Sequence, residues 1–251
     1  MRLTYTEAKA IIAQTKKHFG NKAQVYLFGS RVDDTKRGGD IDLFIVPGAN
    51  QGDINQKKIA FLCALKQLIG DQKIDLVIAK DSSRAIEQIA IKEGAELNLD
   101  KLRIEKVLNE CDKHRLRIND AYQDMQSFMP LTAEKYEQLS KDEVQDIDQY
   151  LYRFSKLQDA MGGKLFKLII SMYEEPHETL TFIDILNKIE KLGIIHGVGD
   201  WKSLREIRNA LSHEYDDEPE QMSDLINKIY SKKELIETIY DRAKKLATKA
   251  L

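Results

Sequence analysis

Hydrophobic residues recur with two different periods along this chain, and the change falls near residue 100. Upstream of it, short apolar runs typical of strands alternate with apolar residues at helical spacing. A first helix is predicted between Thr4, which with Glu7 forms a capping-box pattern, and Gly20. Strands are predicted at 23–28, 41–46 and 73–79, with an edge strand at 96–99, and further helices at 54–69 and 85–93. This order predicts an α/β (α+β) domain with a small mixed sheet.

Beyond residue 100 the strand pattern almost disappears. Apolar residues at helical spacing predict helices at 104–125, 144–172, 183–189 and 222–246. A further helix is predicted from 201 to about 214, with Asp200 as its cap. Links that contain Pro130, Pro176 and Pro219 separate these helices. We therefore predict two domains, an α/β domain at 1–100 and an all-α antiparallel helical bundle at 101–251.

Charge and composition exclude some classes of function. The chain has 251 residues, is 42% hydrophobic, and carries 39 Lys and Arg against 41 Asp and Glu, which gives a net charge of −2. A balanced charge argues against a protein that coats duplex nucleic acid or an anionic membrane. No apolar run approaches the roughly 18 residues that a membrane span needs, and the first residues do not resemble a secretion signal. We expect a cytoplasmic protein with no membrane partner.

Two cysteines, Cys63 and Cys111, both fall among apolar residues of helical patterns. We expect both to be buried free thiols, and two cysteines alone cannot form a structural zinc site.

The richest chemical pattern begins with Gly29-Ser30, directly after a predicted strand. A glycine there lets a phosphate approach the backbone, while amides and a hydroxyl hold its oxygens. Arg31 is a further candidate for contact with a triphosphate. Asp40 and Asp42 are two apart on the next predicted strand, so both carboxylates share one face, about 7 Å apart at Cα.

Asp75 is a third acidic residue within an apolar strand. If that strand pairs beside the one bearing Asp42, three carboxylates converge. Mg²⁺ relieves repulsion between such carboxylates and shares its ligand shell with substrate phosphates. The predicted chemistry is in-line phosphoryl or nucleotidyl transfer to a hydroxyl.

Gly29-Ser30, Asp40-x-Asp42 and Asp75 resemble the motif of the DNA polymerase β-like nucleotidyltransferase superfamily, in its minimal bacterial branch. The resemblance covers roughly residues 5–95, and nine residues separate Ser30 from Asp40 where the family usually has ten. It implies that Gly29 and Ser30 hold the triphosphate of ATP or another nucleoside triphosphate. It also implies that Asp40 and Asp42 bind Mg²⁺ or Mn²⁺ and that Asp75 binds metal and helps to activate the acceptor hydroxyl.

A second pattern lies on the predicted helix that starts at 201. Trp201 is expected to pack in the bundle, whereas Arg208 and His213 carry phosphate-binding and proton-transfer chemistry. Tyr215 follows near the end of the helix. Together these groups could cleave RNA through its 2′-hydroxyl or bind a nucleotide.

Arg208-Asn209-x-x-x-His213-x-Tyr215 resembles the signature of HEPN domains, helical bundles that often form homodimers with a shared RNA or nucleotide site. The resemblance spans roughly residues 103–250 and implies a homodimer formed through the helical domain. In bacterial toxin–antitoxin pairs of HEPN ribonucleases and minimal nucleotidyltransferases, this tyrosine accepts AMP. The resemblance thus implies that Tyr215 is a modified acceptor and that the protein acts in a toxin–antitoxin or phage-defence setting.

Four functions stay open from the sequence. The leading one is Mg²⁺-dependent transfer of a nucleoside monophosphate to a hydroxyl acceptor such as a protein tyrosine, and AMP is the nucleotide that we expect to be transferred. The second is nucleotidylation of an aminoglycoside-type small molecule. The third is an endoribonuclease built from Arg208 and His213 with a regulatory first domain. The fourth is a nucleotide-binding module without turnover, because its Ser30–Asp40 spacer is short.

Overall fold

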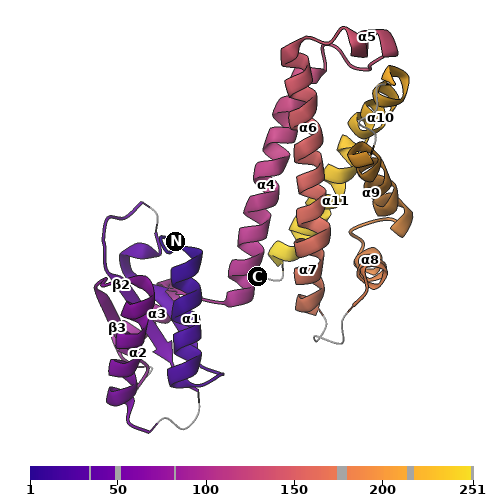
Figure 1. Cartoon of the computed structure of the whole chain (residues 1–251). Helices are drawn as coiled ribbons and strands as arrows, with labels where there is room; N and C mark the ends of the chain where they lie inside the picture. Colours follow the sequence, from indigo (N-terminus) through magenta and orange to yellow (C-terminus); the bar gives the residue numbers. More distant parts are fainter. Residues whose placement is uncertain (34, 49–51, 82, 174–179, 214–217, 250–251) are drawn as a thin grey trace. The chain divides into compact units, whose positions relative to one another are not determined.

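The computed structural model describes residues 1–33, 35–48, 52–81, 83–173, 180–213 and 218–249. The chain forms two compact units, Met1–Arg103 and Ile104–Leu251 (Figure 1). A small mixed sheet with helices makes up the first unit, and the second is mostly helical. The predicted fold class is therefore confirmed. Within the described residues, no helix combines the length and the apolar character needed to cross a membrane.

The first unit is built on a four-stranded sheet with the order β3–β2–β1–β4. β1 (Gln24–Phe28) pairs antiparallel with β2 (Ile41–Val46) and with the short β4 (Ala95–Glu96). β3 (Ile74–Ile78) pairs parallel with β2. A parallel pair needs a crossover connection, which α2 (Ile54–Ile69) supplies here. The predicted edge strand is shorter than expected, because Leu99 already begins a helix.

α1 (Tyr5–Phe19) and α2 pack against the face of this sheet that is opposite to the acidic residues. α1 and α2 pack together and share the core of the first unit with Ile41, Leu43 and Ile45 of β2. Because side chains alternate along a strand, Asp42 points to the opposite face. α3 (Ala85–Glu93) packs against β1. The predicted capping box at the start of α1 is confirmed, with Thr4 and Glu7 bonded to each other's backbone amides.

The second unit is a set of helices around one apolar core. α4 (Leu99–Met125) begins in the first unit and continues into the second, where α6 and α11 run beside it (Figure 1). The remaining elements are α5 (Ala133–Glu137), α6 (Lys141–Ala160), the π-helical turn η2 (Met161–Leu165), α7 (Phe166–Tyr173), α8 (Phe182–Lys191), α9 (Val198–His213), α10 (Pro219–Ser231) and α11 (Lys233–Lys249).

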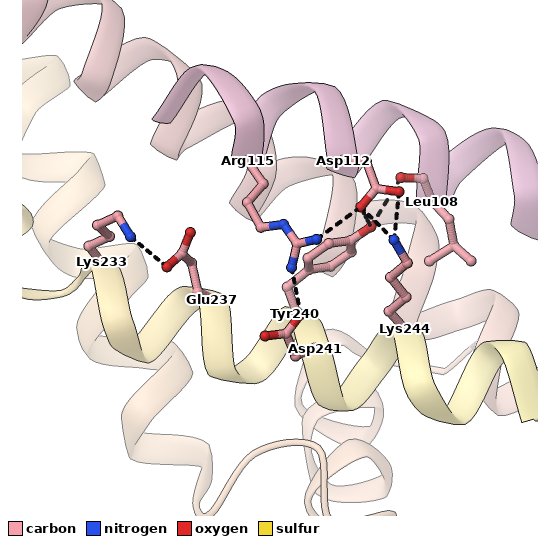
Figure 2. Close-up of polar contacts among 8 residues, drawn as sticks. All are labelled: Leu108, Asp112, Arg115, Lys233, Glu237, Tyr240, Asp241 and Lys244. Atoms are coloured by element: carbon pink, nitrogen blue, oxygen red, sulfur yellow. Dashed lines mark hydrogen bonds and ion pairs between the residues drawn. The ribbon is translucent and has the colours of Figure 1, made fainter. Parts of the chain in front are cut away.

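A polar network fastens α11 to α4 (Figure 2). The Tyr240 hydroxyl lies 2.8 Å from Asp112 Oδ1 and 3.1 Å from the Leu108 carbonyl, and Lys244 Nζ contacts both Asp112 oxygens at 2.7–2.8 Å. Arg115 reaches Asp241 at 2.5 Å. Burial alone would raise the pKa of Asp112, but the bonds from Lys244 and Tyr240 hold it below its usual value. The charges of this network neutralise one another.

Trp201 packs in the helical core, as predicted, and is 1% exposed. Its ring lies 4.7 Å from that of Phe166, and a Cβ on Gly162 would come within 2.9 Å of the indole. Gly162 stands in η2, where the predicted helix 144–172 is interrupted by a π-helical turn. The glycine is thus required by the close approach of the indole. At the adjacent Gly163 a Cβ would meet nothing within 4 Å.

Three further predictions from the sequence are wrong, and one helix was not predicted. Cys63 is exposed, although Cys111 is buried and both are free. The predicted helix 222–246 is two helices that break at Lys232, and α5 has no counterpart in the prediction. Asp200 does not cap α9, which begins at Val198 with its amide bonded to the Glu190 carboxylate at 3.1 Å.

Candidate functional site

The strand register brings the predicted acidic residues together. Asp42 of β2 and Asp75 of β3 are direct neighbours in the parallel pair, and Ile41 is the neighbour of Ile74. The backbone bond from Ile41 N to Lys73 O, at 3.0 Å, extends this register by one residue, so Asp40 stands beside Lys73. Since these side chains alternate with buried isoleucines, they share one face of the sheet. We call Asp40, Asp42 and Asp75 the acidic face.

Lys73 links two members of the acidic face. Its Nζ lies 2.5 Å from Asp40 Oδ2 and 3.9 Å from Asp75 Oδ2. Lys73 was not predicted as a site residue, although Lys73-x-Asp75 repeats the two-residue spacing of Asp40-x-Asp42. The hydrogen bond to Asp40, together with the charges of Asp40 and Asp75, raises the pKa of the Lys73 ammonium.

The surroundings of Asp42 disfavour its negative charge. Burial, followed by the negative charges of Asp75 and Asp40, raises the pKa of its carboxyl. The nearby positive charges of Lys73 and Arg31 oppose this shift without cancelling it. Asp42 therefore lies where negative charge is concentrated, and a cation bound there would be stabilised by the nearby carboxylates.

Gly29 places the end of β1 against Asp42. The adjacent Phe28 is the register neighbour of Asp42, and Gly29 adopts a positive φ of 73°. A Cβ on Gly29 would collide with the Asp42 carboxylate. Ser30 follows in a 3₁₀ turn, and a Cβ on Gly38 would collide with its Oγ. The Gly29-Ser30 corner and Asp42 are thus in direct proximity.

Two arginines fasten the loop that runs from this corner to β2. Arg31 Nη2 donates to the Gly39 carbonyl at 2.5 Å and to Gln72 Oε1 at 3.0 Å. Arg2 donates from Nη1 to the Gly38 carbonyl at 3.0 Å and from Nη2 to the Ser30 carbonyl at 2.8 Å. Arg31, which the sequence suggests as a nucleotide ligand, is thus committed here to the loop, and both ends of the loop are held.

The donor set of the acidic face fits a hard divalent cation. Carboxylate oxygens are the ligands that Mg²⁺ prefers, and the side chains of Asp40 and Asp75 are 42% and 59% exposed. Among the residues that the structure describes, no three His, Cys, Asp or Glu side chains are already grouped as the ligands of one metal ion. Asp40 and Asp75 are instead joined through the Lys73 ammonium.

The second predicted pattern is described only in part. Arg208 of α9 forms an ion pair with Asp159 of α6, with Nη2 and Oδ1 3.3 Å apart, and its side chain is 24% exposed. Arg208 Nε is buried and has no hydrogen-bond partner among the described residues. His213 is the last residue of α9, and Tyr215 lies outside the described residues. Asp159 gave no signal in the sequence, because it is distant from Arg208 along the chain.

Comparison with known proteins gives one match, and it lies in the first unit. The family model described as polymerase beta, nucleotidyltransferase, matches residues 9–100. The match supports a nucleotidyltransferase domain of the polymerase beta superfamily in this segment. The matched segment contains the Gly29-Ser30 corner and all of the acidic face, and it ends before the helical unit. No curated protein and no solved structure gives a significant match to the chain.

Proposed function

We propose that the chain transfers a nucleoside monophosphate from a nucleoside triphosphate to a hydroxyl group, with Mg²⁺ or Mn²⁺ bound at the acidic face. The observation that carries the proposal is the register of β2 and β3, which sets Asp42 beside Asp75, with Gly29 against the Asp42 carboxylate. The family match of residues 9–100 supports nucleotidyl transfer as the class of reaction. Resemblance to minimal bacterial nucleotidyltransferases favours ATP as the donor and AMP as the group transferred.

Each residue of the site has a role in this reaction. The backbone amides at Gly29 and Ser30 and the Ser30 hydroxyl hold the oxygens of the triphosphate. Asp75 accepts the proton of the attacking hydroxyl, whose oxygen forms a bond to the α-phosphorus. The bond from the α-phosphorus to the bridging oxygen breaks, and pyrophosphate leaves with that electron pair. Asp40, Asp42 and Asp75 would hold the divalent cation, which supplies charge compensation for the phosphates.

The acceptor is proposed from resemblance alone. A protein tyrosine fits the pairing of a nucleotidyltransferase with a HEPN-like helical domain, and Tyr215 of this chain is the first candidate. The same resemblance suggests a homodimer formed through the helical unit and a toxin–antitoxin or phage-defence setting. An aminoglycoside-type acceptor is the alternative for a small molecule.

Intact-mass spectrometry tests the proposal. The full chain is incubated with Mg²⁺ and each nucleoside triphosphate, with and without a kanamycin-type acceptor, and any adduct is mapped by peptide analysis. We expect an added nucleoside monophosphate on the protein or the acceptor, abolished in Asp42→Asn and retained in Asp71→Asn. Asp71 is a matched control because it is an exposed aspartate of the same unit that pairs with Lys66. Nucleotide binding without any product would contradict nucleotidyl transfer and would favour a nucleotide-binding module without turnover.

A second candidate function is RNA cleavage by the helical unit. The observation that favours it is the ion pair of Arg208 with Asp159, which holds the guanidinium between two helices, while Nε has no partner within the described part of the chain. Arg can hold a phosphate, and His213 on the same helix can move a proton. RNA degradation that survives Asp42→Asn and is lost in Arg208→Ala and His213→Ala would support this function. Degradation that survives both helical variants would exclude it.

A further inference from the structure

Four charged residues form the corners of a small rectangle on one face of the sheet. Asp40 and Asp42 stand along one side and Lys73 and Asp75 along the other, and the register sets Asp42 beside Asp75. Residues two apart on a strand and residues on adjacent strands are near enough for their side chains to meet. Three corners are negative and one is positive, so the single ammonium faces an excess of carboxylate.

The Lys73 ammonium occupies the electrostatic position that a bound cation would take. It contacts Asp40 at 2.5 Å and Asp75 at 3.9 Å, and these are two of the three carboxylates proposed to hold the metal. The ammonium takes up part of the lone-pair capacity of these carboxylates, and its positive charge repels a second cation at the same oxygens. Metal binding at these oxygens is therefore favoured when the ammonium moves away.

The side chain of Lys73 can leave without disturbing the sheet. Its carbonyl accepts the backbone bond from Ile41, so the chain at this position is fixed at the edge of the β2–β3 pair. The side chain itself is 68% exposed and ends in a flexible four-carbon stem. An exposed ion pair is weak because water screens it, so a change of side-chain rotamer is enough to open it.

We propose that Lys73 is a built-in cation that competes with the divalent metal for Asp40 and Asp75, so that metal binding at the acidic face is an exchange of cations. This inference rests on the proposed metal site and assigns a residue that regulates its occupancy. The exchange weakens binding of the metal alone. A metal that arrives with a triphosphate binds more readily, because the phosphate oxygens are additional ligands that compensate for displacing the ammonium.

Titration with MnCl₂ in the absence of nucleotide tests the exchange. Free Mn²⁺ is measured by electron paramagnetic resonance against the full-length chain and its Lys73→Met, Lys73→Arg, Lys80→Met and Asp42→Asn variants. We expect Lys73→Met to bind Mn²⁺ about fivefold more tightly than the wild type, as for removal of one exposed ion pair. Lys73→Arg keeps the charge and should stay near the wild type.

Lys80→Met is the matched control for the change in net charge. Lys80 is exposed and follows the opposite end of the same strand, two residues beyond Ile78. It should leave Mn²⁺ affinity unchanged. A second measurement is the melting temperature in EDTA, which should fall in Lys73→Met, where the carboxylates lose their partner. Added Mn²⁺ should then raise it more than in the wild type.

The outcomes separate this inference from the proposed function. Binding that Asp42→Asn abolishes but Lys73→Met leaves at the wild-type affinity would overturn the exchange and keep the metal site. A gain of affinity in Lys80→Met equal to that in Lys73→Met would overturn the exchange in favour of a general charge effect. If none of the proteins binds Mn²⁺, or if Asp42→Asn binds it like the wild type, both the exchange and the metal site are wrong.

Discussion

In the first unit neighbouring strands position the candidate side chains, whereas in the second unit two packed helices do so. Asp42 and Asp75 are held by a continuous backbone register, so each carboxylate follows from the position of its residue on a strand. Among the residues that the structure describes, Arg208 is held by an ion pair to Asp159 and by the packing of α9. A strand register survives the replacement of exposed side chains, because its hydrogen bonds belong to the backbone. We therefore expect substitutions on the acidic face to change activity, and substitutions in the helical core to change stability.

The largest expected effect comes from Asp75→Asn. An amide cannot accept the proton of the attacking hydroxyl, so transfer should slow by about 10²- to 10⁴-fold while nucleotide binding and the melting temperature stay near the wild type. Rates of pyrophosphate release and nucleotide titrations measure the two effects. A variant that keeps more than half of the wild-type rate would remove Asp75 from the reaction.

The next largest effect is on the transfer rate, and it distinguishes Gly29 of the Gly29-Ser30 corner from Gly39 of the following loop. Ala at position 29 would place a Cβ against Asp42 on a backbone of positive φ, whereas a Cβ on Gly39 meets nothing within 4 Å. We expect Gly29→Ala to lower the transfer rate by about 10²-fold, since a small displacement of reacting groups has that effect, and Gly39→Ala to change it little. Equal rates in the two variants would show that the corner does not hold the substrate.

Most of the first unit could be predicted because its signals are local. The Thr4–Glu7 capping box, the end of α1 before Gly20 and the limits of β2 follow from a few adjacent residues. The prediction that Asp42 lies beside Asp75 required one further assumption, that β3 pairs with β2, and the structure has this pairing.

The remaining features depend on tertiary contacts. Apolar residues of α2 occur on several sides of the helix, but only one narrow stripe of a helix can face a sheet. Cys63 lies outside that stripe and is exposed. The start of α9 is set by Glu190 of α8, which no local pattern reveals. The break at Lys232 carries neither Gly nor Pro, and buried Ile229 and Ile236 keep helical spacing across it.

A pair of adjacent glycines tests the helical side of the comparison. A Cβ on Gly162 would press against Trp201, whereas one on Gly163 points into open space. We expect Gly162→Ala to lower the free energy of unfolding by about 1–3 kcal/mol, and Gly163→Ala to leave it unchanged or raise it by up to about 1 kcal/mol. Denaturant unfolding of both variants measures this, and equal stabilities would contradict the packing described.

The smallest effect is chemical labelling of the two thiols. Cys63 is exposed, whereas Cys111 is buried and its pKa is raised to about 12, mainly by loss of solvation and then by neighbouring carboxylates. Because the thiolate is the reactive form, iodoacetamide at neutral pH should label the native chain once, at Cys63. Labelling in denaturant should add Cys111. Rapid labelling of Cys111 in the native chain would show that the α4 core opens readily.

The position of bound metal in crystals grown with MnCl₂ and a non-hydrolysable nucleoside triphosphate tests the central claim most directly. The account predicts an anomalous peak about 2.1 Å from oxygens of Asp40 and Asp42, with Asp75 beside it and the triphosphate against Gly29 and Ser30. An ordered nucleotide bound elsewhere, with no anomalous peak at the acidic face, would contradict it.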